Sequence, residues 1–265
     1  MKTLPPPTAV RHVLSFDFDG TLHDPAATPP VPSAFFALIA QLRETRGAIW
    51  GINTGRSMPQ LIEGFIESRF PFLPDWVVAR EREIWFPNEF GRWLAHEKWN
   101  QRCEKDIAKL FKRSRKLLAR LKAAVSEHTG ARWLEMEGEP AGLIAQTQEE
   151  MDWIVGNVLP LAGEEPMLSW QRNSIYLRFS HRDYHKGSGL SAIAALHGLG
   201  PAHCFAIGDS HNDLEMLDPA HAGMRACPAN SVPEILGKVI REGGLVTRQI
   251  HAASVIEALR HFFPQ

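Results

Sequence analysis

The sequence predicts an α/β fold in which helices cover a parallel β-sheet and a second domain is inserted within the chain. Short apolar runs alternate with amphipathic segments from residue 10 to residue 80, and this alternation resumes near residue 185. Such an order is typical of parallel sheets, because each parallel connection needs a crossover that a helix can supply. We therefore expect a core domain made of residues 1–80 and 183–265, with an α+β domain inserted at 81–182.

The first part of the core domain contains three predicted strands and two predicted helices. Apolar runs containing β-branched residues predict the strands, at 10–16, 48–52 and 76–79. Ser33–Arg46 is expected to be helical because its apolar residues share one face, and Gly47 is placed to end this helix. Ser57 is expected to cap the second helix, with Pro59 in its first turn.

The inserted segment has a different, mixed order of elements. A single long helix is predicted over residues 97–127, because apolar residues recur there at three-and-four spacing. Strands are expected at 133–137, 142–147, 167–172 and 175–180, and a helix at 148–159. This order does not continue the alternation of the core, so we expect it to form a separate domain.

The last part of the chain returns to the pattern of the core. A helix is expected at 188–197, followed by strands at 203–207 and 222–226. Ser231 and Glu234 have the spacing of a capping box for the next helix, and a final helix is expected at 253–263.

Composition excludes several classes of protein. The 265 residues carry 30 acidic and 29 basic side chains, which does not suggest a generally basic nucleic-acid binder. Cys103, Cys204 and Cys227 are too few and too widely spaced to predict a disulfide framework, so we expect a reducing, cytoplasmic location. Residues 1–11 hold three consecutive prolines and no apolar region typical of a secretory signal. No run approaches the ~18 apolar residues that span a bilayer, so we expect no membrane partner.

Polar side chains follow several predicted core strands at the point where each strand ends. They are Asp17, Asp19, Thr54, Asp209 and Asp213, with Lys186 at the start of a predicted helix. Ligands of open α/β sheets bind beyond the carboxyl ends of the strands. Although these segments are far apart in sequence, we expect the fold to gather them at one edge of the sheet.

The chemistry of these side chains favours phosphoryl transfer. Four carboxylates in one crevice repel each other, and a hard divalent cation removes that repulsion. Mg²⁺ prefers a few carboxylate oxygens together with water and phosphate oxygens. The hydroxyl of Thr54 and the ammonium of Lys186 are suited to the remaining oxygens of a phosphate group. A cation, a lysine and a hydroxyl around a carboxylate provide the charge neutralisation and positioning that phosphoryl transfer needs.

Four motifs in order carry a resemblance to a known superfamily. They are Asp17-Phe18-Asp19-Gly20-Thr21, Asn53-Thr54-Gly55-Arg56, Lys186-Gly187 and Gly208-Asp209-Ser210-His211-Asn212-Asp213. This series resembles the motifs of haloacid dehalogenase superfamily phosphatases. The insert resembles their type-two α/β cap, and the nearest groups are the Cof-type and sucrose-phosphate phosphatases. The resemblance implies a Rossmann-like core with an inserted α+β cap domain.

The resemblance also implies catalytic and metal-binding roles. Asp17 would be the nucleophile that takes the phosphoryl group, and Asp19 would act as general acid and then general base. Mg²⁺ would be held by Asp17, Asp209 and the backbone carbonyl of Asp19, with Asp213 as a further ligand or supporting carboxylate. The aspartate at position 19 favours phosphate esters over carbon–halogen bonds, because the dehalogenases of the superfamily lack it.

Further residues are expected to bind the phosphate and the rest of the substrate. The resemblance assigns phosphate binding to Thr54, Gly55, Lys186 and Asn212. The segment 79–83 reads Ala-Arg-Glu-Arg-Glu where Cof-type relatives usually carry Ser-Asn-Gly or similar, so we expect its charged residues to alter the substrate contacts. The arginines expected to contact substrate are Arg56, Arg80, Arg82 and Arg172. The expected reaction is hydrolysis of a small phosphorylated metabolite, such as a sugar or polyol phosphate.

Two alternatives remain open at this point. The same site would serve a phosphotransferase or mutase acting on phosphosugars, although mutases of the superfamily usually carry a smaller cap placed earlier in the chain. The other alternative is a non-catalytic module that binds anions or nucleic acid, because residues 98–122 are rich in lysine and arginine. We favour a solvated face of an amphipathic helix for this stretch, since its apolar residues form a separate stripe.

Overall fold

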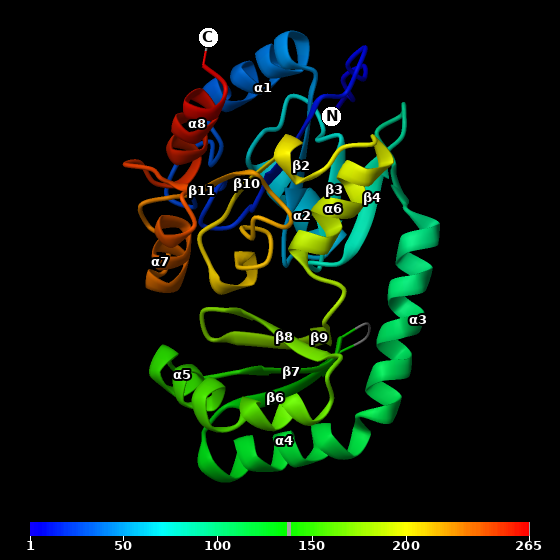
Figure 1. The fold of residues 1–265 in the computed structure, drawn as a ribbon, viewed down its shortest axis with the longest axis vertical. Coiled ribbons are helices and arrows are strands. Elements are labelled where there is room, and N and C mark those ends of the chain that lie inside the picture. Colours follow the sequence, from blue (N-terminus) through cyan, green and yellow to red (C-terminus); the bar gives the residue numbers. More distant parts are fainter. Residues whose placement is uncertain (137–138, 265) are drawn as a thin grey trace. The chain divides into compact units, whose positions relative to one another are not determined.

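The structure is a computed structural model that describes residues 1–136 and 139–264 (Figure 1). The chain divides into two compact units. The first, here called the core unit, comprises Met1–Asn100 and Lys186–Gln265, and the second, the insert unit, comprises Gln101–His185. The expected fold class, a parallel α/β core with an inserted α+β domain, is confirmed.

The core unit is built on one eight-stranded sheet with the order β12-β11-β10-β1-β2-β3-β4-β5. The strands are β1 (His12–Phe16), β2 (Ala48–Asn53), β3 (Trp76–Ala79), β4 (Glu83–Pro87), β5 (Trp93–Ala95), β10 (Cys204–Ile207), β11 (Met224–Cys227) and β12 (Leu245–Val246). Pairing is parallel from β12 to β3, and β4 and β5 are added antiparallel. The chain therefore crosses over repeatedly to place β1 in the middle of the sheet.

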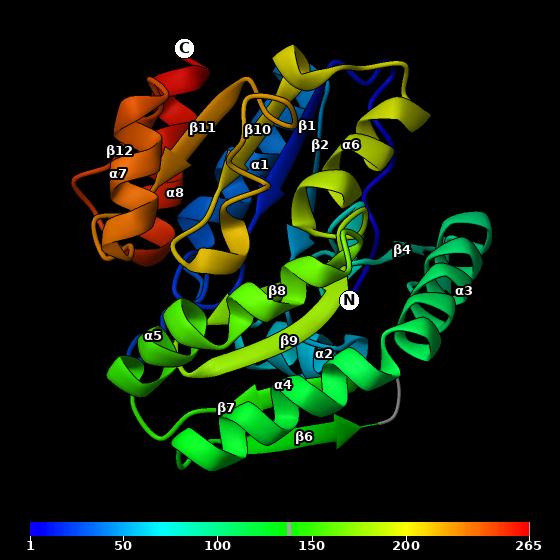
Figure 2. The ribbon, with the colours of Figure 1, turned by 60° about the horizontal axis from the view of Figure 1, so that its bottom comes forward.

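Helices cover both faces of this sheet (Figure 2). They are α1 (Ser33–Arg46), α2 (Met58–Glu67), α6 (Lys186–Leu196), α7 (Pro233–Arg241) and α8 (His251–Phe262). Leu14 and Trp50 pack in one hydrophobic cluster with α1, α2 and α8, whereas their neighbours Val13 and Ile49 pack in a second cluster with α6 and α7. Successive side chains of a strand point to opposite faces, so a strand covered on both sides is apolar throughout.

The insert begins later than the sequence analysis placed it. Residues 81–100 were assigned to the inserted domain, but the structure assigns them to the core unit and begins the insert unit at Gln101. β4 pairs with β3 and β5 pairs with β4, each antiparallel. An antiparallel hairpin needs no crossover helix. Strands β3, β4 and β5 therefore follow one another without helices between them. The alternation of strands and helices that indicated the core domain is absent from this part of the sequence.

The insert unit contains a four-stranded antiparallel sheet with the order β6-β7-β9-β8. Its strands are β6 (Arg132–Met136), β7 (Glu139–Ile144), β8 (Leu168–Asn173) and β9 (Tyr176–His181), with α5 (Gln148–Asn157) between β7 and β8. Residue 137, predicted to end a strand, lies outside the described residues.

The long helix predicted over 97–127 is two helices, α3 (Glu97–Arg113) and α4 (Arg115–His128). The chain changes direction sharply between them (Figure 1). Ser114, which separates the helices, has φ −84° and ψ 5°, outside the α-helical range. Serine is a weak helix former. The apolar spacing continues on both sides of it, so periodicity alone did not show the break.

The basic stretch of these helices carries ion pairs within the insert unit. Arg113 lies 2.7 Å from Glu165, Arg120 lies 2.6 Å from Glu164, and Lys122 lies 3.0 Å from Glu135. These pairs are largely exposed, as expected for the solvated face of an amphipathic helix. Among the described residues, no helix combines the length and apolar character needed to cross a bilayer.

Replacing Gly51 by alanine should destabilise the core unit. An added Cβ would lie 2.1 Å from the indole ring of Trp76, a fully buried side chain of the neighbouring strand. Overpacking of this kind typically lowers the free energy of unfolding by roughly 1–3 kcal/mol. Urea denaturation measures the loss. Gly200→Ala is the control, since nothing lies within 4 Å of its added Cβ, and equal stability of the two variants would contradict this packing.

Candidate active site

The carboxyl ends of three neighbouring strands bring the predicted residues together. Phe16, the last residue of β1, pairs with Ile52 of β2 on one side and with Ile207 of β10 on the other. Asp17 directly follows β1, and the segments containing Thr54 and Asp209 follow β2 and β10. The register therefore sets the three strand ends side by side, as the sequence analysis expected.

Lys186, the first residue of α6, lies at the centre of this group. Its side chain is 0% exposed, and its Nζ lies 2.6 Å from Asp17 Oδ1 and 2.7 Å from Asp213 Oδ1. Burial opposes the ammonium form, but the charges of Asp17, Asp213 and Glu81 outweigh burial and raise the pKa of Lys186. The lysine therefore stays charged and fixes two carboxylates that come from different motifs.

Three carboxylates lie close enough to share one cation. Asp17, Asp209 and Asp213 each offer an oxygen within 4.8 Å of the others. Burial, followed by the charge of Asp213, raises the pKa of Asp17 well above its ordinary value and that of Asp209 to about 6. A hard divalent cation bound by oxygen ligands would offset this repulsion. The donor set therefore fits the kind of metal that the sequence predicted.

The two oxygens of Asp213 are already engaged. Oδ1 accepts from Lys186, and Oδ2 accepts the backbone N–H groups of Asp209 and Ser210 at 3.0 Å each. Asp213 thus fixes both the lysine and the loop that carries Asp209. Of the two roles expected for it, this geometry suits the supporting one better than direct metal binding.

Close approach around Asp209 and Asp213 depends on two glycines. An added Cβ on Gly20, which has φ 78°, would lie 2.6 Å from Asp209 Oδ2, and one on Gly208 would lie 2.3 Å from Asp213 Cγ.

The Thr21 hydroxyl donates to Asp209 Oδ1 at 2.5 Å. Thr21 belongs to the first motif, but its residue type and position alone predicted no role for it. Its side chain orients a predicted metal ligand.

Asp19 lies apart from the three clustered carboxylates and binds Arg56. Arg56 Nε donates to Asp19 Oδ2 at 2.8 Å, and its Nη2 donates to Asp19 Oδ1. The guanidinium also lies over the Phe18 ring, 4.8 Å from its centroid. The side chain of Asp19 remains 41% exposed. Arg56, expected to contact substrate, therefore holds the predicted acid–base residue in this structure.

The predicted phosphate-binding residues Thr54 and Asn212 both form hydrogen bonds with Glu81. Thr54 is buried, and its backbone carbonyl accepts from the N–H of Glu81 at 2.9 Å. Asn212 is also buried, and its Nδ2 donates to Glu81 Oε1 at 2.8 Å. An added Cβ on Gly55 would lie 3.2 Å from the same oxygen of Glu81. Glu81, which the sequence analysis noted only as part of an unusual segment, thus contacts the phosphate-binding residues directly.

The remaining predicted substrate residues are already bound to neighbours. Arg80 Nη1 lies 3.5 Å from Glu83 Oε1, and the buried Arg82 donates to the carbonyl of Arg80 at 3.4 Å. Arg172 belongs to the insert unit. Its buried guanidinium lies 2.6 Å from Asp152 Oδ1, and its Nε donates to the Ser174 carbonyl at 3.0 Å. Arg172 therefore has a structural role within its own unit.

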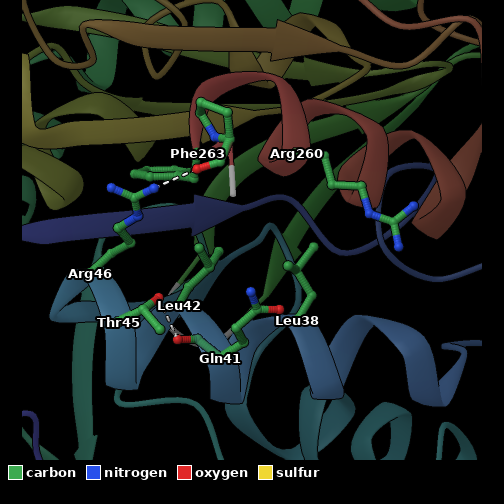
Figure 3. A pocket seen from close by; sticks show the side chains of 8 residues that line it. Leu38, Gln41, Leu42, Thr45, Arg46, Arg260 and Phe263 are labelled. Atoms are coloured by element: carbon green, nitrogen blue, oxygen red, sulfur yellow. Dashed lines mark hydrogen bonds between the residues drawn. The ribbon is translucent and has the colours of Figure 1, made fainter.

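One pocket of the core unit lies away from these residues. It has a volume of about 760 Å³ and lies between α1 and α8, with Leu38, Leu42, Arg46 and Phe263 among its lining residues (Figure 3). None of the predicted catalytic or phosphate-binding residues lines it. The case for an active site therefore rests on the carboxylate cluster and not on this pocket.

Comparison with known proteins bears on the family. Residues 139–241 match the family model described as haloacid dehalogenase-like hydrolase, and this range includes the third and fourth motifs. Over this range the chain is similar to the haloacid dehalogenase-like hydrolases. The resemblance that the sequence motifs indicated is thus confirmed.

The chain also resembles an individual protein over a shorter stretch. It is 40% identical over 78 residues to a phosphoglycolate phosphatase of Methanothermobacter thermautotrophicus, a match that covers 29% of this chain and 32% of that protein. The match therefore spans about a third of the relative's length.

Solved structures share the fold over nearly the whole chain. The sucrose-phosphatase of Synechocystis sp. PCC6803, in complex with sucrose and phosphate, has a TM-score of 0.71 at 17% identity, covering 96% of this chain and 98% of that one. BT4131, a sugar phosphatase of HAD subclass IIB, has a TM-score of 0.64 at 17% identity, covering 95% and 98%. At such identities the likeness establishes the fold.

The raised pKa values predict that metal-free protein loses stability as pH rises. The folded state keeps a proton on Asp209, whose pKa is about 6, at pH values where the unfolded chain, with its ordinary value of 3.8, has released it. The contribution of Asp209 to the free energy of unfolding should therefore fall between about pH 4 and pH 6, by about 1.4 kcal/mol for each unit of pKa difference. Thermal unfolding in EDTA across this range measures the fall.

A divalent cation should reverse this trend, because it binds the ionised carboxylates of the folded state. The rise in Tm on adding Mg²⁺ should be small near about pH 5 and larger near about pH 7. Asp209→Asn is the matched control and should lose most of the rise. Equal stabilisation at both pH values would show that the cation binds elsewhere.

Proposed function

We propose that this protein is a magnesium-dependent phosphatase that hydrolyses a small phosphorylated metabolite through an aspartyl-phosphate on Asp17. The observation that carries the proposal is the buried contact of Lys186 with Asp17, next to the oxygens of Asp209 and Asp213. A carboxylate fixed beside an ammonium and a cation site has the arrangement that a nucleophile for phosphorus requires. The phosphatase relative and the phosphatase structures of the same fold support the reaction class.

Two displacement steps account for the reaction. Asp17 attacks phosphorus, a new P–O bond forms, and the ester P–O bond breaks as Asp19 protonates the leaving oxygen. Asp19 then takes a proton from water, whose oxygen attacks phosphorus and breaks the bond to Asp17. Inorganic phosphate leaves, and both aspartates return to their starting forms. Because Arg56 holds Asp19 in this structure, substrate must replace part of that contact.

Other residues hold the phosphate group during both steps. Lys186, Thr54, Gly55 and Asn212 are proposed to bind its non-bridging oxygens. Asp17, Asp209 and the carbonyl of Asp19 would hold magnesium, which when bound neutralises the charge that gathers on the oxygens. The insert unit is proposed as the cap that selects the organic part of the substrate.

The proposed substrate class is a sugar or polyol phosphate. The names of the structures with this fold, a sucrose-phosphatase and a sugar phosphatase, support this class, and the phosphoglycolate phosphatase supports a small phosphorylated acid as another possibility. A cytoplasmic location is proposed because the three cysteines, Cys103, Cys204 and Cys227, are few, widely spaced and buried.

Asp17→Asn should abolish turnover while leaving the fold intact, because the amide is not a nucleophile for phosphorus. Hydrolysis of p-nitrophenyl phosphate in Mg²⁺ should fall by at least about 10⁴-fold. Asp218→Asn, a change at a partly exposed ion pair with Lys238, is the control and should keep parent activity. Activity of Asp17→Asn at the parent rate would exclude the proposed nucleophile.

Asp19→Asn should slow turnover by roughly 10²- to 10⁴-fold, because it removes general acid–base catalysis. With p-nitrophenyl phosphate, whose leaving group needs no proton, the first step should survive and the phosphorylated enzyme should accumulate. Intact-protein mass after rapid quenching measures this species. Its absence, together with unchanged kcat, would rule out the role of Asp19.

A panel of phosphorylated metabolites tests the substrate class. The highest kcat/KM for phosphate release is expected with a sugar or polyol phosphate. Quantifying inorganic phosphate against new phosphosugar separates hydrolysis from transfer. Formation of phosphosugar without phosphate release would favour a phosphotransferase instead.

A further inference from the structure

The turn between β3 and β4 holds two adjacent non-glycine residues in a left-handed conformation. Arg80 has φ 48° and Glu81 has φ 65°. Non-glycine residues rarely adopt such angles, and they persist where the surrounding contacts fix them, often at functional sites. Glu81 is also only 5% exposed, which is unusual for a carboxylate. The positive φ angles are those of the tight hairpin turn closed by the Arg82 N–H and the Ala79 carbonyl, whereas the burial indicates that the Glu81 side chain is held in place.

Glu81 forms hydrogen bonds with two of the four residues proposed to bind phosphate, lies near the third and acts on the charge of the fourth. Its N–H donates to the carbonyl of Thr54 at 2.9 Å, and its Oε1 accepts from Asn212 Nδ2 at 2.8 Å. The same Oε1 would lie 3.2 Å from a Cβ added to Gly55, and the charge of Glu81 acts on Lys186. The carboxylate therefore uses the amide N–H and the positive charge that a phosphate oxygen would use.

This placement adds a negative charge where an anion is expected to bind. Asp17, Asp209 and Asp213 already surround the single ammonium of Lys186 in the described part of the site. A fourth carboxylate helps neither cation binding, since it is not among the clustered oxygens, nor phosphate binding, which like charge opposes. Because it bonds to Asn212 and acts on Lys186, this charge bears directly on how tightly the phosphate group is held.

We propose that the carboxylate of Glu81 competes with the phosphate anion for Asn212 and Lys186 and so weakens binding of the inorganic phosphate product. This inference rests on the proposed function. In the resting site, Glu81 takes the amide hydrogen of Asn212. A bound phosphate must displace or repel this carboxylate, so product leaves more readily than it would from a site with a neutral residue at position 81.

Glu81→Gln tests the proposal, because glutamine keeps an acceptor for Asn212 and removes the charge. The Kd for inorganic phosphate, measured by calorimetry with the full chain in saturating Mg²⁺, should fall by about 10-fold. The inhibition constant of phosphate against p-nitrophenyl phosphate should fall in parallel, and KM should fall with no rise in kcat. Damage to structure alone would weaken binding and not tighten it.

Two further variants make this test specific to the charge of Glu81. Glu81→Gly also removes the charge and is suited to the positive φ, so it should fold and also tighten phosphate binding. Glu63→Gln, an identical charge change at an exposed position of α2, should leave the Kd unchanged. If the parent binds and releases phosphate but neither Glu81 variant binds it more tightly, this inference fails alone. If the parent neither binds phosphate nor hydrolyses esters, the proposed function fails, and the inference fails with it.

Discussion

The site depends on one buried ammonium between two carboxylates. Lys186 is fully buried, and its Nζ bridges Asp17 from the end of β1 and Asp213 from the loop after β10. Removing the ammonium would leave two buried carboxylates without their counter-charge, which is strongly destabilising. The same contact orients Asp17 and opposes the rise that burial causes in its pKa. Stability of the site and orientation of the proposed nucleophile therefore have a common physical origin.

The core sheet makes this contact possible by aligning strand ends that are remote in sequence. Phe16 pairs with both Ile52 and Ile207, so the residues after them emerge at one edge. Asn53 Nδ2 then donates to the carbonyl of Lys186 at 2.9 Å, which ties the start of α6 to the end of β2. Rigid strands thus supply the positions, and the loops after them supply the chemistry.

The balance of charge links the cation, the phosphate and Glu81. Burial and mutual repulsion raise the pKa values of Asp17 and Asp209, and a bound cation would relieve that repulsion. Glu81 bonds to Asn212 and its charge acts on Lys186, so it opposes a second anion there. A site that held phosphate with every available cation would release its product slowly. A carboxylate at this position limits that affinity without touching the nucleophile.

The sequence alone determined the types of the main elements and the motifs that carry chemistry, because both are local patterns. The strand ends at Asp17, Thr54 and Asp209 followed from short apolar runs, and α1 has the bounds that its apolar face and Gly47 predicted. Tertiary structure decided what depends on distant partners. Asn212 and Glu81, which form a hydrogen bond, are 131 residues apart in sequence. The addition of β4 and β5 to the edge of the core sheet, and the break between α3 and α4 at Ser114, likewise had no signal in the local sequence pattern. Spacing records which residues lie on one face, whereas side-chain contacts depend on the packing of the whole chain.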